Sequence, residues 1–77
     1  MKSKKIQLVK IQDVQELVTI LINFNGDVDL ISGRYVVDGK SLLGIFSLDL
    51  SKPIEIRVHN DAVAEKLFAA IAKYVVD

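Results

Sequence analysis

The stretch of sequence that decides the fold is Asp38-Gly39-Lys40-Ser41-Leu42-Leu43-Gly44-Ile45-Phe46-Ser47-Leu48. Its Asp-Gly pair favours a turn, because both residues tolerate the backbone conformations that turns require. Ser41 is a preferred helix N-cap, since its hydroxyl can accept a hydrogen bond from a free N–H of the first turn. A short helix is therefore predicted over 42–48. It is more apolar than a surface helix needs to be, so we expect Leu42, Leu43 and Phe46 not to be buried together.

The residues before this segment predict a strand, a helix and a hairpin. Residues 5–11 alternate closely enough for a half-buried strand. Asp13 then offers a helix cap, and Asn25-Gly26 offers a left-handed stop. The expected inner face of this helix consists of Val14, Leu17, Val18, Leu21 and Ile22. Strands over 28–30 and 35–37 should then pair as a hairpin around Ser32-Gly33-Arg34.

The residues after the segment predict one more strand and a closing helix. Pro53 opens the strand, whose Ile54, Ile56 and Val58 should point to the core, while Glu55, Arg57 and His59 point the other way. Asn60 or Asp61 should cap the last helix. Its expected inner residues are Val63, Leu67, Ala70, Ile71, Tyr74 and Val75.

These elements predict an α+β fold in the order βαββαβα. Four mostly antiparallel strands would form an open-faced β-sandwich with three helices on one face of the sheet. Seventy-seven residues provide one domain, spanning 1–77, with a compact core.

Composition excludes several classes of function. Ten basic and ten acidic residues give no net charge, which argues against nucleic-acid binding. The chain has no cysteine, so a disulfide, a thiol nucleophile and a zinc knuckle are excluded. No apolar run approaches the roughly 18 residues that a membrane span needs, and the lysine-rich start is too polar for a signal peptide. We therefore expect a cytoplasmic protein that does not bind membranes.

The segment from Lys40 to Leu48 resembles the regulatory segment of HPr, the phosphocarrier family of bacterial sugar transport. In that family a Lys-Ser pair precedes a short helix that reads Ser, apolar, apolar, Gly, apolar, apolar, Ser, Leu, and Ser41 to Leu48 have that order. The spacing on both sides also fits, so the resemblance covers most of residues 5–76. It implies a single HPr-like domain in the phosphotransferase system, which acts on protein partners and is not an enzyme.

One part of the HPr pattern is missing. The resemblance places the phospho-accepting histidine, with an arginine and a proline, near the start of the first helix, where this chain has Lys10, Ile11, Gln12 and Asp13. Counting back from Ser41 without gaps puts Lys10 at the histidine's place, and a two-residue deletion would put Gln12 there. Neither forms a phosphohistidine. In this the chain resembles Crh-type members, which also lack the histidine.

The resemblance also implies a regulatory role for Ser41, because the matching serine in HPr and Crh is phosphorylated by a dedicated HPr-type serine kinase. The modified proteins then act as corepressors with a transcriptional regulator. Leu42, Leu43 and Phe46 match the apolar patch by which the family meets its partners, with Lys40 expected at the polar rim. Two interpretations stay open for Ser41: a helix cap only, or a cap that is also a regulatory site.

No catalytic, metal or cofactor site is predicted. His59 is the only histidine, and one imidazole without a second ligand or a nucleophile indicates neither zinc nor a catalytic triad. We therefore expect a non-catalytic, regulatory or protein-interaction module of the sugar phosphotransferase system. The alternatives are a divergent phosphocarrier and, more distantly, a small ligand-binding domain of split βαβ type.

Overall fold

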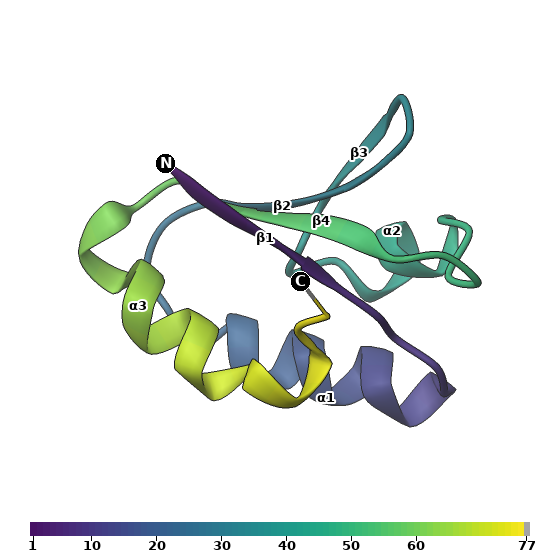
Figure 1. Ribbon diagram of the computed structural model, residues 1–77, viewed down its shortest axis with the longest axis horizontal. Coiled ribbons are helices and arrows are strands. Elements are labelled where there is room, and N and C mark those ends of the chain that lie inside the picture. Colours follow the sequence, from purple (N-terminus) through teal and green to yellow (C-terminus); the bar gives the residue numbers. More distant parts are fainter. Residues whose placement is uncertain (77) are drawn as a thin grey trace.

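A computed structural model describes residues 1–76 and shows four strands, three α-helices and a short 3₁₀ turn (Figure 1). In chain order the elements are β1 (Lys2–Ile6), α1 (Ile11–Leu21), β2 (Val28–Ser32), β3 (Tyr35–Asp38), α2 (Leu42–Phe46), β4 (Ile54–Val58), α3 (Asp61–Ala70) and η1 (Ala72–Tyr74). The predicted order βαββαβα is confirmed.

The four strands form one sheet in the order β1-β4-β2-β3, and each neighbouring pair is antiparallel. In Figure 1, α1 and α3 lie together on the same side of this sheet. The short helix α2 packs against α1 and β3. This arrangement confirms the predicted open-faced α+β fold.

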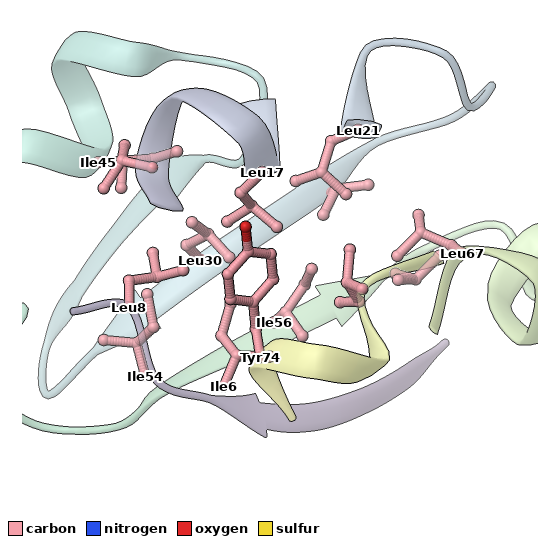
Figure 2. Close-up of a cluster of buried hydrophobic side chains, with 14 of the residues drawn as sticks. Ile6, Leu8, Leu17, Leu21, Leu30, Ile45, Ile54, Ile56, Leu67 and Tyr74 are labelled. Carbon is pink, nitrogen blue, oxygen red and sulfur yellow. The ribbon is translucent and has the colours of Figure 1, made fainter. Parts of the chain in front are cut away.

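The core lies between the sheet and the helices, and it is apolar throughout the described residues (Figure 2). On β4, Ile54, Ile56 and Val58 are at most 2% exposed, as their alternation with polar residues predicts. Leu17 and Leu21 of α1 and Leu67 of α3 are fully buried against them. The burial of these side chains supplies the main favourable contribution to folding.

The first strand differs from the prediction of residues 5–11. β1 is Lys2–Ile6, and its pairing with β4 stops where Ile6 meets Ile54, the first residue of β4. Beyond that point the chain has no strand to pair with. Gln7 is instead held by Tyr74, whose carbonyl accepts from the Gln7 N–H at 2.8 Å.

The first helix begins and ends earlier than predicted. It starts at Ile11 with Lys10 as the N-cap, so Asp13 is the third helical residue and not the cap. It ends at Leu21, and Ile22 is 58% exposed instead of lying on the inner face. Gly26 does have the left-handed backbone conformation, with φ of 98°, but it lies in the connection after the helix and not at its end.

The last helix is capped by Asn60, whose side-chain oxygen accepts from the N–H of Ala62 at 3.0 Å. It ends at Ala70, which is exposed, so the prediction of an inward Ala70 is wrong. Ala64 is fully buried instead. Tyr74, at the end of the tighter η1 turn, is 5% exposed, so the prediction that it lies on the inner side is confirmed.

Candidate protein-binding site

The start of α2 is capped as the sequence predicts. Ser41 has an extended backbone, and its hydroxyl oxygen accepts from the N–H of Gly44 at 3.1 Å. Gly44 is also where α2 comes close to β3, because a Cβ atom there would lie 3.3 Å from the Cβ of Val37. The cap and the glycine together hold this one-and-a-half-turn helix against the side chain of Val37 on β3.

The side chains of α2 divide sharply between core and solvent. Ile45 is fully buried, whereas Leu42 is 37%, Phe46 40% and Leu43 83% exposed. This confirms the expectation that the three predicted contact residues are not buried together. The reason is geometric, since positions 42, 43 and 46 span a wide arc of a short helix and the fold covers only the side that carries Ile45.

Lys40 connects the start of α2 to the far end of α1. Its ammonium group donates to the carbonyl oxygen of Phe24 at 2.7 Å, and its backbone N–H donates to a carboxylate oxygen of Asp38 at 2.9 Å. The carbonyl group of Phe24 lies beyond the end of α1 and is an acceptor for this donor. Lys40 therefore fixes the approach to α2, and Ser41 lies beside the C-terminal end of α1.

The start of α1 has a different construction. Lys10 is the N-cap, and the carboxylate of Asp13 accepts from the N–H groups of Val9 at 2.9 Å and Lys10 at 3.0 Å. These two hydrogen bonds lower the pKa of Asp13 below its usual value. An anion approaching this helix start would meet the negative charge of Asp13, which lies in the first turn. Ile11, Gln12 and Asp13, which the resemblance places near the start of the first helix, form its first turn, and Ile11 and Gln12 are exposed.

His59 follows β4 at the end of the sheet away from the start of α1. The register shows this, because Val58 pairs with Lys2 at the beginning of β1, whereas α1 follows the end of β1. The ring Nε2 of His59 lies 2.7 Å from a carboxylate oxygen of Asp29. The imidazole therefore does not reach the place where the resemblance expects a phosphoryl acceptor.

Two contacts beside the start of α1 were not predicted. The Gln7 side-chain amide donates to the carbonyl oxygen of Leu50 at 3.0 Å, which ties the chain before α1 to the connection after α2. The buried Tyr74 donates its hydroxyl to Glu16 of α1 at 2.5 Å. Burial and the Glu16 carboxylate raise the pKa of Tyr74. The signal for this contact is a tyrosine at a core position, since its hydroxyl needs a partner.

Among residues 1–76, no group of three or more histidine, cysteine, aspartate or glutamate side chains is arranged to hold a metal ion. Within the same residues, no helix is both long enough and apolar enough to span a bilayer.

Comparison with known proteins gives similarity in structure only. No protein-family model matches the chain, and no curated protein matches its sequence. The crystal structure of HPr-C-His from Thermoanaerobacter tengcongensis aligns with a TM-score of 0.80 at 20% identity, covering 95% of this chain and 89% of that one. The phosphocarrier protein HPr from Bacillus anthracis str. Ames aligns with a TM-score of 0.75 at 24% identity, covering 97% and 96%. The chain therefore has the fold of the HPr phosphocarrier proteins.

Proposed function

We propose that this chain is a non-catalytic, HPr-like protein-interaction module of the bacterial sugar phosphotransferase system. It would act in the cytoplasm, bind a protein partner through α2, and be regulated by phosphorylation of Ser41. The observation that carries the proposal is the 83% exposure of Leu43 on a helix whose start is fixed by Ser41 and Lys40.

The contact surface proposed for the partner consists of Leu42, Leu43 and Phe46, with Lys40 at its edge. These side chains belong to α2, which is fixed in the core by the buried side chain of Ile45. A partner would therefore cover apolar groups that are already positioned, so little conformational freedom is lost on binding. Apolar anchors on a rigid element, surrounded by polar groups, are the usual centre of a protein interface.

Phosphorylation of Ser41 would change this surface without unfolding it. The phosphoryl group adds about −1.5 to −2 charges next to backbone donors of the helix start, where negative charge is favourable. The same charge would lie beside Leu42 and Leu43. A partner that prefers the unmodified apolar surface would then be released, and a partner with arginine side chains would be recruited.

A divergent phosphocarrier is the second candidate, because the two similar structures are phosphocarrier proteins of the HPr type. That function needs a side chain that accepts a phosphoryl group at the start of α1. The residues there include no imidazole, and Asp13 is engaged with the N–H groups of Val9 and Lys10. The non-catalytic function is therefore preferred.

The decisive experiment exposes the chain to two phosphoryl donors. With ATP and an HPr-type serine kinase, we expect one phosphoryl group, located at Ser41 by fragmentation mass spectrometry. Ser41→Ala should not be modified, whereas Ser47→Ala, a control at the other end of α2, should react like the wild type. Modification at any other residue, or none at all, would contradict the regulatory part of the proposal.

With phosphoenolpyruvate and the general phosphotransferase enzyme, we expect no transfer. An acid-labile phosphate on the chain, at His59 or elsewhere, would favour the phosphocarrier instead.

The same kinase serves as a defined partner for the α2 surface. We expect Leu43→Ala to raise the KM of the kinase for this chain about tenfold, which corresponds to about 1.4 kcal/mol. Val9→Ala is the matched control, because Val9 is also an exposed aliphatic residue, at 79%, but lies before the start of α1. Equal KM values for the two variants, both confirmed as folded, would move the binding surface away from α2.

A further inference from the structure

The two edges of the sheet differ in how they are protected. On the β1 side, the C-terminal segment pairs with the end of the strand, where the Val76 N–H donates to the carbonyl oxygen of Lys5 at 3.0 Å and Val75 bridges Ile6. This strand also carries Lys2, Lys4 and Lys5. Lysines and a covering segment both prevent the addition of another strand. The β1 edge is therefore closed to further pairing.

The β3 edge has neither form of protection. β3 is the last strand of the sheet, and within residues 1–76 its one strand neighbour is β2; Figure 1 shows the β2–β3 hairpin at this margin. Tyr35 is 68% and Val36 59% exposed, and the strand contains no lysine. An exposed edge with large apolar side chains is a template for strand pairing.

The register shows which backbone groups of β3 point away from β2. The hairpin has the two-residue loop Gly33-Arg34, and in such hairpins the flanking residues, here Ser32 and Tyr35, form a hydrogen-bonded pair. Hydrogen-bonded pairs recur at every second residue, as the bond from the Gly39 N–H to the Val28 carbonyl confirms at 2.7 Å. The intervening residues of β3, Val36 and Asp38, therefore direct their backbone groups to the open edge.

One of these groups is already used. The carbonyl oxygen of Asp38 accepts from the Ser41 N–H at 3.0 Å. The open edge therefore offers the N–H and the carbonyl of Val36 and the N–H of Asp38.

We propose that this edge pairs with β3 of a second copy of the chain, antiparallel and with Val36 opposite Val36. The two valines then exchange both N–H···O=C bonds across a two-fold axis. The Asp38 N–H donates to the carbonyl of Arg34 in the second copy, twice by symmetry. Tyr35 lies opposite Val37, an aromatic and β-branched pair of the kind that stabilises antiparallel strands. The two four-stranded sheets become one continuous sheet.

Charge complementarity favours a second copy of the chain as the partner of this edge, and it favours the register with Val36 opposite Val36. Within one chain, Asp38 lies directly opposite Asp29 on β2, a like-charge pair that is unfavourable. Arg34 makes no ion pair among the described residues. With Val36 opposite Val36, each Arg34 stands opposite an Asp38 of the other copy.

The two neighbouring registers lose this match. Sliding the second copy by two residues in one direction places Arg34 opposite Lys40, which is a repulsive pair. Sliding it the other way places Asp38 opposite Ser32 and leaves Arg34 without an acid.

The dimer should be weak, because the pairing segment is short. β3 has four residues, and the chain turns away at Gly39, so the interface falls below the roughly 1,200 Å² of a standard stable complex. Association should therefore depend on concentration and reverse on dilution.

Sedimentation equilibrium from about 10 μM to about 1 mM tests this, and we expect the average mass of the wild type to rise from one chain towards two. Val36→Pro should stay monomeric over the same range. Proline removes the N–H that bonds the second copy, and it is tolerated at an edge position whose N–H points away from the sheet. Thermal unfolding followed by circular dichroism shows whether this variant is folded.

Charge reversal tests the register without relying on the proline variant. Arg34→Glu alone places two acidic pairs in its dimer, and Asp38→Lys alone places two basic pairs, so each should associate at least about tenfold more weakly than the wild type. Mixed together, the two variants should form a heterodimer, because each interchain pair then joins opposite charges. This exchange of partners is specific to the proposed register.

Several results would overturn the proposal. A wild type that remains monomeric at about 1 mM would exclude the proposed dimer. The open edge would then be a candidate for pairing with an extended segment of another protein. A folded Val36→Pro variant that dimerises like the wild type would exclude pairing at this edge. Failure of the two charge variants to associate when mixed would exclude this register.

Discussion

At the start of α1, the carboxylate of Asp13 accepts from the N–H groups of Val9 and Lys10, whereas at the start of α2 the hydroxyl of Ser41 accepts from the N–H of Gly44. Lys40, next to Ser41, reaches Phe24 beyond the end of α1. The two helix starts therefore lie near opposite ends of α1, a helix of eleven residues that is roughly 16 Å long.

The HPr resemblance would place two functions on one molecule, phosphoryl transfer at the start of the first helix and serine phosphorylation at the start of the second. In this chain the two helix starts differ in their chemistry. The start of α1 carries the carboxylate of Asp13 and no imidazole among its residues, as the proposed non-carrier function requires. The start of α2 has a neutral hydroxyl cap next to exposed apolar side chains. It can gain charge by modification and still offer a surface to a protein.

The largest stability effect expected from this comparison is on the buried side of α2. Ile45→Ala should lower the free energy of unfolding by about 2–5 kcal/mol, because it leaves a cavity under the helix. Leu43→Ala should change it by less than about 0.5 kcal/mol, since Leu43 is 83% exposed. Urea unfolding of both variants measures the difference. If both variants lost a similar free energy of unfolding, α2 would not have one side that packs into the core and another that is available to a partner.

A smaller effect is expected at the cap. Ser41→Ala should cost about 0.5–2 kcal/mol, because the Gly44 N–H loses its acceptor. Ser41→Asp should be nearly neutral, since aspartate also caps and its charge suits the helix start. Urea unfolding at neutral pH compares the three proteins. A harmless alanine, or an aspartate as damaging as alanine, would remove the physical basis for phosphorylation at this position.

The smallest effect is a pH dependence that distinguishes the two helix starts. Hydrogen bonds lower the pKa of Asp13 in the folded chain, so its carboxylate stabilises the fold above the ordinary value of 3.8. That contribution should disappear as the pH falls through the lowered folded-state pKa. The stability gap between the wild type and Asp13→Asn should therefore close in acid. The gap for Ser41→Ala should show no such closure, because no proton is exchanged there. If the free energies of unfolding of the two variants depended on pH in the same way, the pH dependence could not be assigned to Asp13.

Much of the fold follows from local patterns in the sequence. Alternation of apolar and polar residues predicts β4, and Gly33, with φ of 61°, supplies the left-handed residue at the predicted hairpin turn. The Ser41 cap is also local, because it joins residues three positions apart. Such features depend on few neighbours, so a pattern along the chain is enough to predict them.

The errors occur where distant segments decide. The end of β1 is set by the beginning of β4, and Ala70 is exposed at the end of α3 although the helical period places it on the inner face. Partners such as Glu16 for Tyr74 and Phe24 for Lys40 are separated by long stretches of sequence. Nothing in the periodicity of either segment identifies the other.

The sequence by itself determined the order of the elements, the cap at Ser41 and the absence of an imidazole at the start of α1. These depend on residue identity and on spacing over a few positions. Only the tertiary structure decided which side of α2 is exposed and that β3 is left as an open edge. These depend on which distant surfaces pack together, because burial and strand pairing are properties of the assembled sheet and helices.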